Sequence, residues 1–369
     1  MNIMNLQWID NGACPPFHPN PAVTRVQPRR SVRLIPLLLA VLAGLTAFVY
    51  IGLHALIAWI LTYPPVASLH SNPLAAKGLA YEDVSFPSAD GRSLVNGWWI
   101  PAPAASYSGA GRAVVLSHGY GANREEYWVP MYDVAEWLHK RGFDVLMFDY
   151  GFADPQRRLP ATGGVSEARQ LLGAIRYARA AGAEKLVVWG FSMGAGTALL
   201  AALQDDSRAI DGMILDSTFL PTNETVGHNL AQYAPLKPSL LLIRLFLRFW
   251  SGTGLEHIPA EEALSTAFPF PIFLVHGTED AKVPATLAEH VAGAQQHPDS
   301  RLWIVPGAIH EMMFRTHAEE YTRLAGDFLD RVTHDAAPVL VASYDGAADG
   351  DGDAQKSDAK AGHAPAGRH

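Results

Sequence analysis

Residues 185–204 read KLVVWGFSMGAGTALLAALQ, and this stretch decides the fold. An apolar, β-rich run over 186–189 is followed by a helical run of small residues that begins at Ser192. Between them lies GFSMG, residues 190–194, a G-x-S-x-G pattern. A nucleophilic serine has to project from a sharp strand-to-helix turn, and the flanking glycines leave room for the crowded backbone. The pattern therefore predicts Ser192 as a nucleophile at the end of a buried strand.

The turn at Ser192 also predicts an oxyanion-binding site. It lies at a helix N-terminus, where free backbone N–H groups and the helix dipole favour a developing negative charge. We expect the N–H of Met193, the residue after the serine, to be one donor. A second glycine-flanked turn, HGYG at 118–121, follows an apolar run, and we expect the N–H of Tyr120 to be the second donor. His118 is expected to hold this loop rather than to take part in catalysis.

Strands and helices alternate along the rest of the chain. A β-hairpin is predicted from the runs 81–86 and 94–100, which are joined by a Ser-Ala-Asp-Gly turn. One strand and one helix lie on either side of the turn at Ser192. Further strands are expected at 113–117, 144–148, 212–215, 272–275 and 302–305, and further helices at 123–140, 166–181, 286–295 and 317–332. This alternation predicts a mostly parallel sheet covered on both faces, with functional groups at the carboxyl ends of the strands.

Two later strand ends carry the remaining groups of a catalytic triad. The strand end HGTEDAKVP places Asp280 where an orienting carboxylate belongs, with Glu279 and Asp216 as competitors for that role. His310 lies in a loop after the last strand, and the order Ser192, Asp280, His310 is the chain order typical of such triads in α/β sheets. We therefore expect His310 to be the general base and Asp280, rather than its two competitors, to be the triad acid.

Residues 217–268 separate two consecutive strands by far more than a normal connection. They include LLLIRLFLRFW at 240–250, an apolar run interrupted by Arg244 and Arg248. Because the insertion leaves the carboxyl end of a strand, we favour a cap that walls the substrate pocket. The alternative is a helix that rests on a membrane surface, and the two interpretations are compatible.

The segment 34–61 contains no charged side chain and is long enough to cross a bilayer, so we interpret it as a transmembrane helix. His54 is the only strongly polar side chain in it. Four arginines closely precede the segment, whereas Lys77 is the only basic residue close after it. The positive-inside rule then places the N-terminus in the cytoplasm and everything after Tyr63 on the outer, periplasmic side of a bacterial inner membrane.

Two other targeting signals fit this region less well. A cleaved signal peptide would have a shorter apolar region and a small-residue cleavage site, and Val66-Ala67-Ser68 is a poor one. Arg29-Arg30 matches a twin-arginine signal only faintly. We therefore expect an uncleaved anchor.

The remaining segments carry no predicted chemistry. We expect a loose tail at 1–33, a linker at 62–80 and a disordered tail at 335–369. Asp349, Asp351 and Asp353 imitate the start of a calcium loop, but Ala and Lys stand where that loop needs its glycine and its closing glutamate. The only cysteine, Cys14, leaves no disulfide within the chain. A net charge of -8 with no basic run beyond the anchor argues against nucleic acid as a partner.

Residues 81–334 resemble the α/β-hydrolases, and among them the single-pass, membrane-anchored serine hydrolases and related bacterial esterases. The matching pieces are SHGYGANR, the FDY at 148–150, GFSMGAGTA, LDSTF, HGTEDAKVP and GAIH. The resemblance implies the eight-stranded α/β-hydrolase fold and a Ser192–His310–Asp280 triad. Relatives commonly continue the FDY with an arginine and a small glycine-rich loop, whereas this chain has GFADP at 151–155, which is expected to alter the pocket rim.

The function expected from these residues is hydrolysis of carboxylic esters, with no metal and no organic cofactor. An apolar cap beside a membrane favours an uncharged or lipid-like ester as the small-molecule substrate. A peptidase or amidase is the alternative, with Glu125 or Glu126 as an anchor for a substrate amine. A non-catalytic binding module of the same fold would be expected to lack a triad member. The oligomeric state is not predicted.

Overall fold

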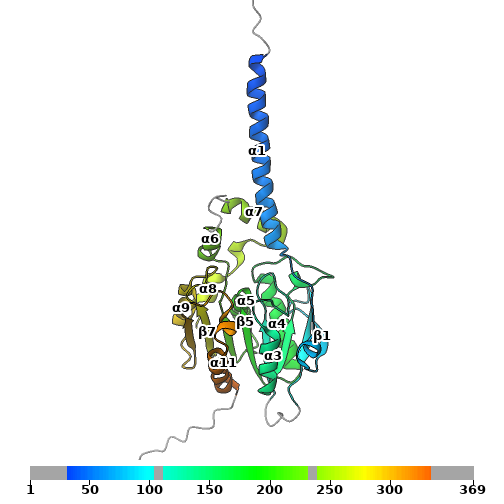
Figure 1. The fold of residues 1–369 in the computed structure, drawn as a ribbon, viewed down its shortest axis with the longest axis vertical. Helices are drawn as coiled ribbons and strands as arrows, with labels where there is room; N and C mark the ends of the chain where they lie inside the picture. Colours follow the sequence, from blue (N-terminus) through cyan, green and yellow to red (C-terminus); the bar gives the residue numbers. More distant parts are fainter. Residues whose placement is uncertain (1–30, 104–110, 232–238, 334–369) are drawn as a thin grey trace, which may run out of the picture.

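The computed structural model describes residues 31–103, 111–231 and 239–333. Most of the N-terminal tail, Cys14, and the C-terminal tail with its three aspartates lie outside the described residues. Figure 1 shows a two-part shape, in which one long helix projects from a body built around a sheet.

The body contains one eight-stranded sheet in the order β1-β2-β4-β3-β5-β6-β7-β8. Strands β1, β2 and β4 pair antiparallel, and every other neighbouring pair is parallel. The strands are β1 Glu82–Pro87, β2 Leu94–Ile100, β3 Arg112–Ser117, β4 Asp144–Phe148, β5 Lys185–Phe191, β6 Gly212–Asp216, β7 Ile272–Gly277 and β8 Arg301–Val305. The central strands are apolar and buried on both faces, as expected for parallel strands covered by helices.

Helices cover both faces of this sheet. Residues of α4, α5, α8 and α9 pack in one apolar core with alternate side chains of the strands, and α3 and α11 pack on the other face. The helices and 3₁₀ turns are α1 Ser31–Thr62, α2 Pro73–Lys77, α3 Met131–Lys140, η2 Gly151–Ala153, α4 Val165–Ala180, α5 Met193–Leu203, α6 Asn223–Ala231, α7 Leu240–Ser251, η4 Leu255–His257, α8 Ala260–Ser265, α9 Ala285–Ala294, α10 Met313–Thr316 and α11 Ala318–Thr333.

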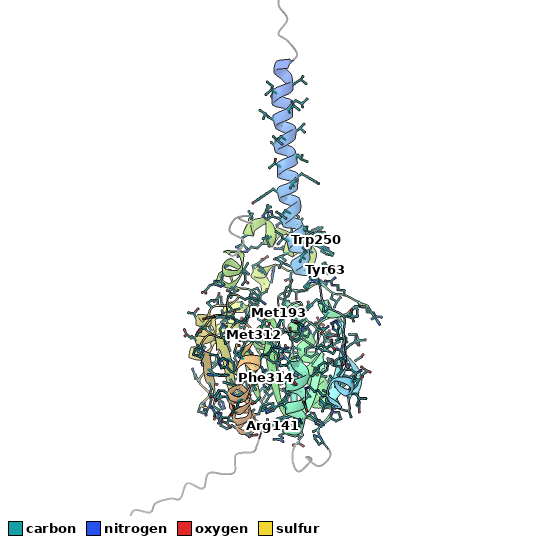
Figure 2. The ribbon with its side chains drawn as sticks, in the orientation of Figure 1. Tyr63, Arg141, Met193, Trp250, Met312 and Phe314 are labelled. Atoms are coloured by element: carbon teal, nitrogen blue, oxygen red, sulfur yellow. The ribbon has the colours of Figure 1, made fainter. Side chains whose placement is uncertain are left out.

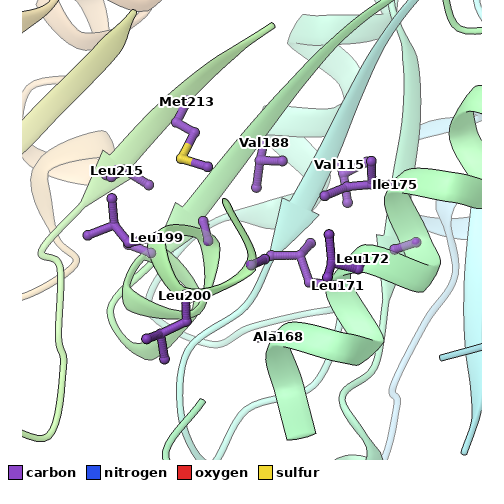
Figure 3. Close-up of a cluster of buried hydrophobic side chains, with 14 of the residues drawn as sticks. Val115, Ala168, Leu171, Leu172, Ile175, Val188, Leu199, Leu200, Met213 and Leu215 are labelled. Atoms are coloured by element: carbon purple, nitrogen blue, oxygen red, sulfur yellow. The ribbon is translucent and has the colours of Figure 1, made fainter. Parts of the chain in front are cut away.

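The first core holds α5 in place behind the central strands. Figure 3 shows Val188 of β5 and Met213 and Leu215 of β6 facing Leu199 and Leu200 of α5. All of these side chains are buried. The helix that follows the G-x-S-x-G turn is thus fixed by packing as well as by its own small residues, which lets the turn keep one geometry.

One predicted helix begins later than expected. We predicted 123–140, but α3 starts at Met131. Pro130 precedes it and disfavours helical geometry at the residue before it. Glu126 has φ 44°, and Tyr127 is exposed. The segment before Pro130 is therefore an ordered loop.

The insertion between β6 and β7 divides into two parts. Its last helix, α8, buries Ala263 and Leu264 in the core beneath α5 and belongs to the helical layer of the body. Its first two helices, α6 and α7, lie above the helical layer of the body, and α7 lies beside the last turns of α1 (Figure 1). Only this first part has the position of a cap.

Within the described residues, α1 is the one helix that is long and apolar enough to cross a membrane, over Leu34–Thr62. Every residue of 34–53 is exposed in the isolated chain, whereas the last turns of α1 pack against α7. The segment after it, predicted as a linker, contains the short helix α2. Its Lys77 pairs with Asp133 and Glu136 of α3 and so ties the segment to the body.

Candidate active site

The turn between β5 and α5 has the strained geometry that lets a nucleophile project from the end of a strand. Ser192 has φ 49° and ψ -117°, outside the regions that residues with a side chain prefer. Glycine is needed on both sides of it. A Cβ at Gly190 would lie 2.6 Å from the Cα of Ala195, and one at Gly194 would lie 2.1 Å from the carbonyl oxygen of Ser117. The spacing of the two glycines thus follows from the close approach of α5 to its neighbouring backbone.

The structure brings Ser192, His310 and Asp280 into one hydrogen-bonded chain. The Oγ of Ser192 lies 2.8 Å from Nε2 of His310, and Nδ1 of His310 lies 2.6 Å from Oδ2 of Asp280. The three residues come from three loops at the carboxyl end of the sheet, and each is at least nine-tenths buried. With the Nδ1 proton donated to Asp280, Nε2 is free to accept the serine proton.

The second oxygen of Asp280 is held by its own loop. Its Oδ1 accepts the backbone N–H groups of Lys282 and Val283 at 2.8 and 2.9 Å. Burial alone would raise the pKa of this carboxyl, but these bonds together with the one from His310 lower the pKa below its ordinary value. Burial also lowers the pKa of His310, against the opposing effect of Asp280. The pair is thus set to hold an aspartate anion beside a neutral imidazole at neutral pH.

The two competing acids are placed elsewhere. Glu279 is exposed. Asp216 is fully buried, but its oxygens accept the hydroxyls of Tyr321 and Ser217, both at 2.9 Å. Burial raises the pKa of Asp216 to about 7. Neither residue is hydrogen-bonded to His310 in the described structure.

The two expected oxyanion donors lie on either side of the serine. Met193 is the first residue of α5, so its N–H has no acceptor within the helix. Gly119, which precedes Tyr120, is so close to the turn that a Cβ on it would lie 3.5 Å from the Cβ of Ser192. The described part of the chain offers the N–H of Tyr120 no acceptor. Both groups are therefore available near Ser192, and their role as an oxyanion hole stays a prediction.

His118 has the structural position that the sequence predicted. It is fully buried, its Nδ1 donates to the carbonyl of Gly119, and its Nε2 accepts the backbone N–H of Tyr150 at 3.0 Å. Burial lowers its pKa to about 4, which keeps it neutral. The imidazole thus ties the loop after β3 to the end of β4.

A buried ion pair beside His118 was not assigned a role from the sequence. The guanidinium of Arg124 lies 2.7 Å from Oδ2 of Asp149, whose Oδ1 accepts the Arg124 backbone N–H, also at 2.7 Å. The same guanidinium stacks over Trp98 at 4.8 Å. Both residues lie in motifs that carry the resemblance to α/β-hydrolases, Arg124 in GANR and Asp149 in FDY, but the motifs alone did not indicate that the two side chains pair. The pair fixes the loop that carries Tyr120.

Two glutamates lie on the other side of His310, namely Glu126, which the sequence suggested only as an anchor for a substrate amine, and Glu311, which was assigned no role. Oε2 of Glu126 accepts the N–H of Gly119 at 2.9 Å, and Oε2 of Glu311 lies 3.8 Å from Nε2 of His310. Both side chains are buried, and neither Oε1 has a hydrogen-bond partner among the described residues. Burial raises the pKa of Glu126 to about 7. Burial, and then the charge of Glu126, raise the pKa of Glu311 well above its ordinary value.

These glutamates have one further trait in common, which is a backbone in the left-handed region, with φ 44° at Glu126 and 59° at Glu311. No sequence pattern predicts that these two residues lie close together, because they meet only when the loops after β3 and β8 come together. We define them as the glutamate pair.

Among the described residues, no group of three or more His, Cys, Asp and Glu side chains is arranged to hold a metal ion. Cofactor-free chemistry stays a prediction.

Comparison with known proteins supports this architecture. Residues 112–242 match a family model described as alpha/beta hydrolase fold. The uncharacterised protein YfhR of Escherichia coli is 26% identical over 253 residues, which are 67% of this chain and 80% of YfhR. An uncharacterised protein of Mycobacterium tuberculosis is 27% identical over 282 residues, which are 76% of this chain and 88% of that protein.

Solved structures give the same result for the fold. An esterase of Pyrococcus furiosus superposes with a TM-score of 0.58 at 24% identity, over 74% of this chain and 98% of the esterase. A thermophilic esterase of Thermogutta terrifontis superposes with a TM-score of 0.50 at 19% identity, over 69% of this chain and all of the esterase (100%). With its eight-stranded sheet, its strand-to-helix turn and its match to this family model, the chain has the α/β-hydrolase fold.

Proposed function

We propose that this chain is a membrane-anchored serine hydrolase that cleaves carboxylic esters through a Ser192–His310–Asp280 triad. One observation carries the proposal, namely the unbroken hydrogen-bonded chain from the strained Ser192 through His310 to Asp280. A hydroxyl, an imidazole and a carboxylate in this order form a charge-stabilised general base next to a nucleophile.

The proposed reaction has two halves. His310 takes the proton of Ser192 as its Oγ attacks the ester carbonyl, and Asp280 stabilises the resulting imidazolium. The N–H groups of Met193 and Tyr120 hold the tetrahedral oxyanion. His310 then gives its proton to the departing alcohol, and water, activated by the same imidazole, releases the acid from the acyl-enzyme.

Ester cleavage is favoured over amide cleavage because neither of the two candidate anchors for a substrate amine, Glu125 and Glu126, is well suited to that role. A peptidase of this kind would need an anionic anchor for the substrate amine. Glu125 is already occupied, since it accepts the N–H groups of His70 and Ser71 and the hydroxyl of Tyr132. Glu126 is buried, with a pKa raised to about 7, and so is a weak anchor. The two esterases of the same fold support the same choice.

We further propose that α1 anchors the chain in a membrane, with the N-terminus in the cytoplasm and the hydrolase body on the outer side. The length and apolar character of α1 support the anchor. The arginines before it support the orientation. A C-terminal alkaline phosphatase fusion should be active in the periplasm, and an inactive fusion would overturn the orientation.

Activity-based labelling tests the central proposal on the full chain in nanodiscs. A fluorophosphonate should label wild type stoichiometrically on Ser192, and both Ser192→Ala and His310→Ala should lose the label. An absence of labelling of folded wild type would instead favour a non-catalytic binding module.

A substrate panel tests the bond that is cleaved. It would pair p-nitrophenyl esters of rising acyl length with aminoacyl anilides. A preference for the anilides would overturn the esterase assignment.

A further inference from the structure

We propose that the outer face of α7 lies in the lipid leaflet beside α1, and that the site takes its ester substrate from that leaflet. This inference rests on the proposed hydrolase function for the substrate, and on α1 as the membrane span for the lipid contact. The surface concerned is the row Leu241, Leu245 and Phe249, which we call the α7 apolar row.

The α7 apolar row is unusually open for residues of its kind. Leu241, Leu245 and Phe249 are 78%, 58% and 72% exposed, whereas Ile243 on the opposite face is buried. The spacing of four residues places the three side chains on one face of the helix. Contiguous large apolar groups at a protein surface mark a contact with a membrane or another molecule. Apart from the two arginines, α7 carries no charged residue.

A hydrogen bond fixes the position of α7 relative to the anchor. The backbone N–H of Ser239, the residue that caps α7, donates to Nε2 of His54 in α1 at 2.8 Å. Around this bond His54, Ala58 and Thr62 are buried, one helical turn apart. The only strongly polar side chain of the apolar segment is thus satisfied by the start of α7, and α7 lies alongside the last turns of α1 (Figure 1).

The length of α1 then sets the depth of α7. Residues 34–53, all exposed, span about 30 Å at 1.5 Å per residue, which is about the thickness of the hydrocarbon core of a bilayer. The boundary between hydrocarbon and head groups therefore falls near His54, where α7 begins. Figure 2 shows Tyr63 and Trp250 at the same junction, and aromatic residues are enriched at this level of a membrane. This geometry therefore places the α7 apolar row in contact with the lipid leaflet.

The same junction is joined to the candidate site on two sides. The hydroxyl of Tyr120 donates to the carbonyl of Leu61 at 2.7 Å, so the end of α1 contacts the loop that carries the predicted oxyanion donor. On the other side, Asn229 of α6 donates to the carbonyl of Lys282 at 2.8 Å, next to the loop of Asp280.

The anchor and the α6–α7 pair therefore frame the region above Ser192. Figure 2 shows Met193, the neighbour of Ser192, between this junction and the lower part of the sheet. An ester that lies at the head-group level of the leaflet is at the height of this frame. Acyl glycerolipids carry their esters at that level, and they are the substrate class we assign.

Spectroscopy tests the lipid contact without reference to activity. In a Cys14→Ser background, Leu245→Cys is labelled with the environment-sensitive dye NBD in nanodiscs of phosphatidylcholine and phosphatidylglycerol. Leu94→Cys, on strand β2 and also about half exposed at 49%, is the matched control. NBD at 245 should emit at shorter wavelength and be quenched by lipids with a doxyl group near the head group, whereas NBD at 94 should show neither effect. Water-like emission at 245 would overturn the proposal, as would blue-shifted emission without lipid quenching, which would indicate a second copy or another protein.

Kinetics tests the source of the substrate. The ratio of diacylglycerol hydrolysis in the nanodisc to p-nitrophenyl butyrate hydrolysis should fall about tenfold in Leu241→Ser/Leu245→Ser, because two leucines no longer favour the leaflet. Leu74→Ser/Leu94→Ser, which removes two exposed leucines elsewhere, should keep the wild-type ratio. An unchanged ratio in the α7 variant would overturn entry from the leaflet. Failure of wild type to cleave either ester would count against the proposed hydrolase function, while the NBD result would still decide where α7 lies.

Discussion

Two groups of buried carboxyls flank His310, namely Asp280 on one side and the glutamate pair on the other, and their pKa values are shifted in opposite directions. Asp280 receives hydrogen bonds from His310 and from two backbone N–H groups, and its pKa is lowered. In the glutamate pair, Glu126 accepts the backbone N–H of Gly119, one oxygen of each residue has no hydrogen-bond partner among the described residues, and both pKa values are raised. Donors, and not burial, decide which carboxyl is an anion.

This arrangement favours a negative charge on one side of the imidazole and disfavours one on the other. Nδ1 of His310 faces Asp280, whose pKa is lowered, and Nε2, which faces Ser192, has Glu311 nearby, whose pKa is raised well above its ordinary value. An anion on both sides would favour the imidazolium and remove the free base. The difference between the two groups of carboxyls therefore helps to keep His310 ready to accept a proton.

The largest effect should come from removing the anion. Asp280→Asn should lower kcat/KM for p-nitrophenyl butyrate by about 10⁴-fold, because the amide no longer stabilises the imidazolium and favours the wrong tautomer of His310. Asp216→Asn is the matched control. Asp216 is more deeply buried, but its pKa is raised to about 7 and it does not touch His310, so its loss should stay below about threefold. Equal losses in the two variants would mean that the triad acid has been misassigned.

A smaller effect is expected on stability when the glutamate pair loses a carboxyl. Folded Glu126 has a pKa of about 7 against 4.5 for the free group, so the native state binds more protons and the free energy of unfolding falls as pH rises through that window. Glu126→Gln cannot ionise and should be more stable than wild type by about 3 kcal/mol at pH 8, with no gain at pH 4. Urea unfolding of the full chain in detergent, followed by circular dichroism, measures both values. A gain of the same size at pH 4 would show that ionisation is not the cause.

The smallest effect is expected at the second glutamate. Glu311→Gln replaces a carboxyl whose pKa is raised well above its ordinary value by a neutral amide of the same shape, so kcat/KM at pH 7 should change by less than about threefold. The variant is compared with wild type on p-nitrophenyl butyrate from pH 5 to pH 9. A loss near that of Asp280→Asn would make Glu311 an ionised partner of His310 and would remove the difference between the two groups.

The sequence predicted those parts of the molecule that depend on neighbours along the chain. The apolar run before GFSMG, the small residues after it and the glycine-flanked turn at 118–121 are local signals of strand, turn and helix, and the structure has these elements where they were expected. The loop ends that carry Asp280 and His310 could also be found, because parallel strands bring their carboxyl ends to one edge.

What the sequence could not predict depends on contacts between distant segments. The sequence around Glu126 does not indicate that Glu311 lies beside it, and the sequence of α1 does not indicate that His54 contacts Ser239. The helix predicted from 123 failed for a different reason. The apolar spacing continues across Pro130, but the proline sets the boundary, and α3 begins at the next residue.

The junction at the end of α1 has a consequence for how this protein can be modified. The carbonyls of Leu61, Thr62 and Pro64 accept hydrogen bonds from Tyr120, Ala161 and Arg158 of the body. A soluble truncation that begins after these residues leaves three donors of the catalytic body without their acceptors. An inhibitor screen on such a truncation would therefore select compounds that bind an altered pocket. For the same reason a chimera with a foreign anchor should retain the native residues from His54 to Pro64, because these residues are hydrogen-bonded to the catalytic body and to α7.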